Sequence, residues 1–207
     1  SGLQFPWELG SFDDVWKDHR GPGVEDRQMV SEMYKVPVEN IHLTHGATQA
    51  LGIAIASASR GGKVAVEMPS YGPQSQTDRI LGLETITVRR LPTDKEWIID
   101  REAWEDVLSQ VDLLTICPQL NPVGWTYTDE DREWLIGACR RHDVRIISDE
   151  VYSGADRNWK PFFEEGDNCV SISSLTKVHG LGQIRYGWMI ASTEIIANAE
   201  NTFHNMA

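Results

Sequence analysis

The stretch Asp112–Asp149 reads DLLTICPQLNPVGWTYTDEDREWLIGACRRHDVRIISD and carries one complete unit of strand, helix and strand. Its first part, Asp112–Cys117, is an apolar run of strand length. Asp129–His142 is typical of a helix, with an acidic residue in its first turn and basic residues in its last. Arg145–Ser148 (RIIS) is a second apolar strand. Because a helix separates the two strands, we expect them to lie parallel in one sheet.

The same alternation of strands and helices continues on both sides of this unit. Further predicted strands are Ile41–Thr44, Lys63–Glu67, Glu84–Arg89, Cys169–Ser173 and Gly187–Ala191, and further predicted helices are Val24–Lys35, Thr48–Ser59, Pro73–Leu81, Arg101–Gln110 and Thr193–Asn205. The pattern predicts an α/β fold of three layers, α/β/α, around a mostly parallel seven-stranded sheet. One strand, Gly187–Ala191, is expected to run antiparallel because no crossover helix separates it from the strand before it.

Length and composition are those of one globular domain: 207 residues, with 41% hydrophobic and 24% charged residues, values that exclude wholesale disorder. We expect residues 1–23 to form an irregular N-terminal segment and residues 24–207 to form the domain. The formal net charge of −12 argues against a nucleic acid or an anionic membrane as the main partner. No apolar run approaches the ~18 residues that a membrane helix needs.

The three cysteines, Cys117, Cys139 and Cys169, show no CxxC spacing. The sequence therefore predicts buried free thiols and neither a disulfide framework nor a zinc site. Free thiols are typical of a reducing compartment, so we expect a cytoplasmic protein. His42 and His45 have no third ligand in register, and no metal site is expected.

Ligands bind beyond the carboxyl ends of the strands in sheets of this kind, and five of the predicted strands are followed by a distinctive motif. The motifs are GATQAL at Gly46–Leu51, PSYG at Pro69–Gly72, NPVG at Asn121–Gly124, DEVY at Asp149–Tyr152 and SLTKVHGLGQIRYGW at Ser174–Trp188. Taken singly, the first two are better explained by ordinary turns, and the third is equally well explained as one because Asn-Pro is a common turn dipeptide. An unpaired Asp149 is costly at a strand end, and Lys177 and Arg185 suit a Schiff base and a phosphate.

As an ordered set, these motifs resemble the fold-type-I pyridoxal-phosphate enzymes, specifically the class I/II aminotransferase family, from about Val24 to the end of the chain. The resemblance implies an aminotransferase of amino-acid metabolism with pyridoxal 5'-phosphate (PLP) as cofactor. It implies three catalytic residues. Lys177 carries PLP as a Schiff base and then moves the substrate proton. Asp149 keeps the pyridine nitrogen protonated, and Tyr152 donates to the ring oxygen together with Asn121.

The resemblance also implies how the rest of the cofactor is held. Tyr71 stacks on the ring, and the phosphate binds at the turn that opens the helix after Gly46. The cofactor-binding set is Gly46, Ala47, Thr48, Tyr71, Asn121, Asp149, Tyr152, Ser174, Lys177 and Arg185. A cis peptide bond is expected between Asn121 and Pro122.

Members of this family act as homodimers on an amino acid and a 2-oxo acid. They continue with a small C-terminal domain, whose arginine binds the substrate carboxylate. The chain resembles the large domain, residues 24–207, without that small domain. We therefore expect this fragment to take up PLP and to associate with itself, but to show negligible aminotransferase activity.

Two alternatives remain open at this stage. A PLP-dependent lyase, cyclase or decarboxylase on the same scaffold would share the matched residues. A non-enzymatic aminotransferase-like effector domain of a transcription regulator is the weaker alternative. It is disfavoured by the net charge of −12 and by the absence of a basic helix-turn-helix segment before Val24.

Overall fold

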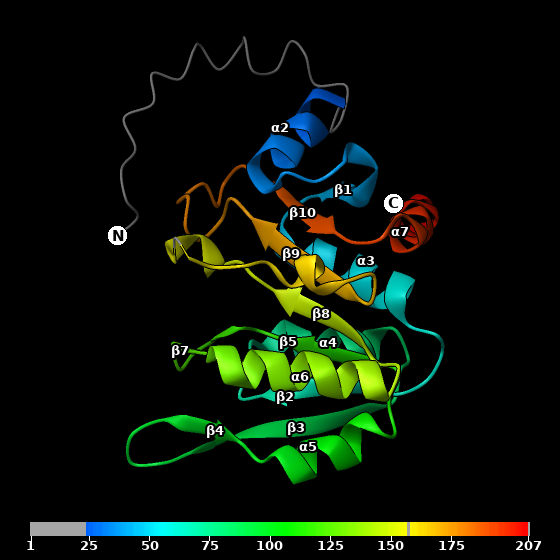
Figure 1. Ribbon diagram of the computed structural model, residues 1–207. Helices are drawn as coiled ribbons and strands as arrows, with labels where there is room; N and C mark the ends of the chain where they lie inside the picture. The colour runs from blue at the N-terminus through cyan, green and yellow to red at the C-terminus, as the bar shows by residue number, and fades with distance from the viewer. Residues whose placement is uncertain (1–23, 157, 207) are drawn as a thin grey trace.

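The computed structural model describes residues 24–156 and 158–206, so the predicted irregular segment 1–23 lies outside the described residues. An eight-stranded sheet, in the order β1-β10-β9-β8-β5-β2-β3-β4, runs through the molecule (Figure 1). Its strands are β1 (Ile41–Thr44), β2 (Val64–Met68), β3 (Thr85–Pro92), β4 (Trp97–Ile99), β5 (Leu113–Ile116), β8 (Arg145–Asp149), β9 (Cys169–Ser174) and β10 (Gly187–Ile190). A separate hairpin consists of β6 (Gln119–Leu120) and β7 (Trp125–Thr126).

The strand directions follow from the connections between strands. β3, β2, β5, β8 and β9 pair in parallel, as expected for strands joined through helices. β10 runs antiparallel to both β9 and β1, which confirms the prediction for Gly187–Ala191. β1 therefore points the same way as the parallel strands, and its carboxyl end lies at the same edge of the sheet.

The sheet has one strand more than the seven predicted from the sequence, and this strand is a second antiparallel one. β4 pairs antiparallel with β3, with Arg90 opposite Ile99. The turn between them is closed by the Thr93 hydroxyl, which accepts from the N–H of Glu96 at 3.0 Å. β4 was not predicted, because three residues between a turn and a helix are too few to show an alternating pattern.

Helices cover both faces of the sheet and complete the three predicted layers (Figure 1). They are α2 (Val24–Tyr34), α3 (Ala47–Ala58), α4 (Gly72–Ile80), α5 (Arg101–Leu108), α6 (Asp129–Arg141) and α7 (Thr193–Met206). α3 packs against α7 and α4 on one face, while α5 and α6 contact each other on the opposite face. α2 packs against β1 at one edge of the sheet.

Two hydrophobic cores lie on the two faces of the sheet. Because side chains alternate along a strand, Val64 and Val66 enter the core beneath α3 and α7, whereas Ala65 enters the core beneath α5 and α6. α3 is apolar on nearly all sides because it contacts the sheet and two neighbouring helices. This packing holds the carboxyl ends of the central strands in a fixed relation to the first turn of α3.

Asp78 is an acidic residue on the buried face of α4. Its side chain is fully buried, and neither carboxyl oxygen has a hydrogen-bond partner among the described residues. Burial raises the pKa of Asp78 to about 6, above the value of ~3.9 expected in the unfolded chain. A raised folded pKa means that stability is fully present below about pH 4 and is lost as the pH rises to about 6.

We expect Asp78→Asn to remove this loss. The free energy of unfolding of the variant, minus that of the wild type, should rise by about 3 kcal/mol between pH 4 and pH 7.5. Urea unfolding at a series of pH values measures this difference. Asp94→Asn, at an exposed turn, is the matched control and should show no comparable change. A difference for Asp78→Asn that does not vary with pH would contradict the expectation, because it would show that folding does not raise the pKa of Asp78.

Candidate active site

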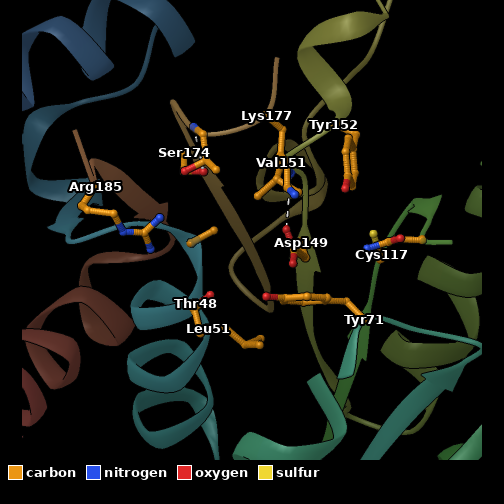
Figure 2. Close-up of a pocket in the computed structure, with 13 residues that line it drawn as sticks. Thr48, Leu51, Tyr71, Cys117, Asp149, Val151, Tyr152, Ser174, Lys177 and Arg185 are labelled. Carbon is orange, nitrogen blue, oxygen red and sulfur yellow. Dashed lines mark hydrogen bonds between the residues drawn. The ribbon is translucent and has the colours of Figure 1, made fainter. Parts of the chain in front are cut away.

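The predicted motifs meet at one edge of the sheet. Asp149 ends β8 and Ser174 ends β9, while Thr44 of β1 lies opposite Gly187 of β10, which lies opposite Ser174. A pocket of about 160 Å³ opens at this edge (Figure 2). Its lining consists of Ala47, Thr48, Leu51, Tyr71, Cys117, Asn121, Asp149, Val151, Tyr152, Ser174, Thr176, Lys177 and Arg185.

The structure brings together all the predicted site residues except Gly46 in this lining, and Gly46 directly precedes Ala47. Asp149 lies in the middle of the pocket (Figure 2). Arg185 and Thr48 lie on the side of α3, and Tyr152 lies on the opposite side. Residues from five separate motifs thus surround one space of small-molecule size.

The first turn of α3 leaves its backbone N–H groups available to a ligand. α5 and α6 are capped by side chains: Asp100 accepts from Ala103 at 3.2 Å, and Thr128 accepts from Asp131 at 3.1 Å. α3 begins after Gly46, and no side chain of the described part of the chain caps it. An uncapped helix N-terminus carries partial positive charge and binds anions such as phosphate.

Two glycines allow this turn to lie close to its neighbours. Gly46 has a φ of +96°, and a Cβ there would lie 2.6 Å from Nη2 of Arg185. A Cβ on Gly187 would lie 2.6 Å from the carbonyl carbon of Gly46. Sequence reasoning did not assign a role to Gly187. The signal that could have found it is a glycine at the first position of a buried strand, which often marks a close backbone approach.

Further groups that suit an anion lie beside this turn. Arg185 is exposed, and Nη2 donates to the carbonyl oxygen of His45 at 3.4 Å. Its guanidinium forms no ion pair with any acid in residues 24–156 or 158–206. The Ser174 hydroxyl is buried and accepts from the N–H of Thr176 at 3.3 Å. Guanidinium, hydroxyl and helix N-terminus together match the donor set of a bound phosphate.

Asp149 is a buried acid that faces the pocket. One of its carboxyl oxygens accepts from the N–H of Val151 at 3.3 Å, and no cation of the described residues is within ion-pair distance. Burial raises the pKa of Asp149 to about 7, an effect that the Val151 N–H and the positive charge of Lys177 oppose and that the charge of Glu150 adds to. A cationic ligand group placed against Asp149 would stabilise its ionised form.

Glu150, the next residue, is also buried but has its own partners. Its carboxylate accepts from Nε1 of Trp159 at 3.2 Å, from the N–H of Phe162 at 2.9 Å and from the hydroxyl of Ser171 at 2.7 Å. Burial nevertheless raises its pKa, and these donors lower it. Of the two adjacent acids, Asp149 is therefore the one whose carboxyl oxygens can still accept hydrogen bonds from a ligand.

The remaining predicted residues surround the centre of the pocket. The Nζ atom of Lys177 lies 5.7 Å from the centre of the Tyr152 ring. Tyr71 is 43% exposed and can present its ring face to a ligand. Asn121 lies at the turn of the β6–β7 hairpin, and its bond to Pro122 is cis, which confirms the prediction.

Four lining residues were not predicted from the sequence: Leu51, Cys117, Val151 and Thr176. Leu51, Val151 and Thr176 lie within predicted motifs and Cys117 ends a predicted strand, but none of the four was assigned a role toward a ligand. Cys117 directly follows β5 and therefore brings the carboxyl end of that strand into the pocket lining. It is a buried free thiol, as predicted for all three cysteines, and burial raises its pKa.

The chain is similar to several known proteins. The sequence model of the family described as aminotransferase class I and II matches residues 27–206. Histidinol-phosphate aminotransferase of Escherichia coli (strain SMS-3-5 / SECEC) is 26% identical over 165 residues, which are 78% of this chain and 45% of that protein. The chain thus spans about half the length of the curated relatives it matches.

Solved structures show the same fold. N-succinyldiaminopimelate aminotransferase from Mycobacterium tuberculosis matches with a TM-score of 0.79 and 21% identity, over 87% of this chain and 51% of that one. A PLP-bound C-S lyase from Staphylococcus hominis matches with a TM-score of 0.72 and 16% identity, over 86% of this chain and 55% of that one. At these identities the likeness extends to the fold alone.

Proposed function

Because the chain belongs to the class I and II aminotransferase family, we propose that it binds PLP and transfers an amino group from an amino acid to a 2-oxo acid. The observation that carries this proposal is the position of Asp149. It is a buried carboxylate without a cation partner among the described residues, and it shares one pocket with Lys177 and the uncapped N-terminus of α3.

The pocket fits the three parts of PLP. The first turn of α3, Ser174 and Arg185 would hold the phosphate, and the glycines at 46 and 187 let Arg185 and the turn lie close together. Tyr71 would cover one face of the ring, and Asn121 and Tyr152 would donate to its oxygen. When bound, PLP supplies an aldehyde that reacts with amines and a ring that accepts electrons.

Lys177 has two tasks in this proposal. Nζ of Lys177 would hold the cofactor through its aldehyde until the substrate amine takes that place. Nζ would then carry the proton that leaves the substrate Cα. Lys177 is exposed and lines the pocket, so its Nζ is free to serve both tasks.

Asp149 would keep the ring nitrogen of the cofactor protonated. Its carboxylate is buried, so its interaction with a positive charge is weakly screened. Without that charge, burial destabilises the ionised form of Asp149, and this raises its pKa. Bound cofactor and ionised Asp149 therefore stabilise each other.

A lyase is the second candidate, supported by the fold that the chain shares with the C-S lyase from Staphylococcus hominis. A single-turnover assay separates the two reactions. The PLP-loaded protein is mixed with a panel of L-amino acids, and 2-oxo acid and ammonia are quantified. Transamination yields up to one equivalent of 2-oxo acid per chain and no ammonia. Ammonia release would favour the lyase. Because repeated turnover of this fragment is expected to be negligible, the assay counts the product of one turnover, and no product from any donor would contradict both reactions for this chain.

We also propose a homodimer in a reducing compartment such as the cytoplasm. The buried free cysteines are consistent with reducing conditions. Met29 and Met33, four residues apart on one side of α2, are both more than half exposed and would suit contact with another copy. Within the described residues, no helix is both long enough and apolar enough to span a bilayer. Light scattering coupled to size-exclusion chromatography measures the oligomeric state.

A further inference from the structure

A buried cluster lies beneath the hairpin that carries Asn121. At its centre is Glu67 of β2, which is fully buried. One carboxyl oxygen, Oε1, accepts from Nε of Arg90 at 2.5 Å and from the Tyr127 hydroxyl at 2.8 Å. The other, Oε2, accepts from the backbone N–H of Cys117 at 3.2 Å. One carboxylate thus contacts three separate parts of the chain.

Arg90 neutralises Glu67 while remaining in an aromatic environment. Its guanidinium carbon lies 3.8 Å from the centre of the Tyr127 ring, 4.2 Å from that of Trp125 and 5.5 Å from that of Trp104. Its Nη1 and Nη2 atoms have no hydrogen-bond partner in the described chain, so ring faces take the place of hydrogen-bond acceptors. The cluster thus pairs two opposite charges within a shell of aromatic rings.

The segment between Cys117 and Tyr127 needs such an anchor. It contains strands of two residues each, and an isolated two-stranded hairpin is marginally stable. Glu67 binds its first residue through the backbone of Cys117 and its last residue through the side chain of Tyr127. Both ends of the hairpin are therefore fixed on the same carboxylate, and Asn121 projects from the turn between them.

We propose that Glu67 and Tyr127 are positioning residues, which hold the Cys117–Tyr127 hairpin so that the Asn121 amide reaches the ring oxygen of PLP. The proposal rests on the proposed function, since it assigns the hairpin a task toward that cofactor. Residues 67, 90 and 127 are far apart in sequence and lie behind the pocket wall, and none of them lines the pocket.

Tyr127→Phe tests this proposal with little disturbance of packing. It removes one hydroxyl and keeps the ring that covers Arg90. Tyr34→Phe is the matched control, because Tyr34 is a half-buried tyrosine that packs against the separate core cluster of α2, β1 and β10 and has no part in the Glu67 cluster. Asn121→Ala provides the benchmark for complete loss of the amide, and Glu67→Gln is the second variant should Tyr127→Phe fail to fold.

The first measurement is hydrogen exchange of the cofactor-free proteins, followed by mass spectrometry of peptides. Loss of a hydrogen bond to a charged group should raise exchange in residues 117–127 about tenfold in Tyr127→Phe. Tyr34→Phe should leave that segment unchanged. Equal exchange in Tyr127→Phe and wild type would show that the cluster does not hold the hairpin and would overturn the proposal.

The second measurement is the pH titration of the visible absorbance of PLP bound to each protein. A displaced Asn121 donates less well to the ring oxygen, so Tyr127→Phe should shift the titration midpoint in the same direction as Asn121→Ala. Faster exchange with an unshifted midpoint would make the cluster merely structural and would also overturn the proposal. If wild type takes up no PLP at all, the proposed function fails, while the exchange result still decides whether Glu67 holds the hairpin.

Discussion

Replacement of Lys177 by alanine is expected to lower the rate of amino-group transfer by about 10³-fold, the typical effect of losing the group that moves the proton. The variant also loses the amine that attaches the cofactor. Stopped-flow absorbance of the PLP-loaded proteins mixed with an amino acid measures the rate. Lys95→Ala, in the exposed turn between β3 and β4, is the control and should retain the wild-type rate.

A small amine added to Lys177→Ala should restore part of the rate, since it can enter the pocket and carry the proton in place of Nζ. Rescue by an amine distinguishes a lost proton carrier from a damaged fold. A Lys177→Ala protein that retains the wild-type rate would contradict the assignment of Lys177, because no other lysine lines the pocket in the described chain.

Replacement of Asp149 by asparagine is expected to lower the same rate by about 10²- to 10³-fold, the usual effect of removing one electrostatic partner of a reacting group. Asparagine fills the same space but cannot balance a protonated ring nitrogen. The phosphate contacts at α3, Ser174 and Arg185 lie elsewhere in the pocket, so the variant should still take up PLP. Equilibrium dialysis measures the uptake.

Glu150→Gln is the matched control for Asp149→Asn. It removes a buried negative charge one residue away, but its carboxylate is bonded by Trp159, Phe162 and Ser171 and does not line the pocket. We expect its rate to fall far less than that of Asp149→Asn. Equal losses in the two variants would mean that negative charge near the strand end matters in general and that Asp149 has no specific partner.

Much of the fold follows from local pattern. Apolar runs of strand length alternate with amphipathic or apolar helices, and this alternation identified seven strands and six helices of the described chain. The direction of β10 followed from the missing crossover helix before it. β4 was not predicted because Trp97–Ile99 is too short to show an alternating pattern of apolar residues. Its pairing with β3 depends on the turn at Thr93.

The candidate site could be anticipated because parallel strands present their carboxyl ends at one edge. Each motif alone was ambiguous, and only the order of the five motifs along the chain indicated a shared site for PLP. Contacts between distant residues could not be anticipated in this way. Gly187 matters because the backbone of Gly46 packs against it, and Glu67 matters because Tyr127, sixty residues away, bonds to it. Neither pair has a spacing that a sequence pattern could reveal.

The central claim, that Lys177 attaches PLP in this pocket, is tested most directly by covalent trapping. The protein is incubated with PLP, reduced with borohydride and digested, and the labelled peptide is identified by mass spectrometry. The account predicts a single pyridoxyl label on Lys177, which disappears in Lys177→Ala. A label on a different lysine, or no label on a protein shown to be folded by circular dichroism, would contradict it.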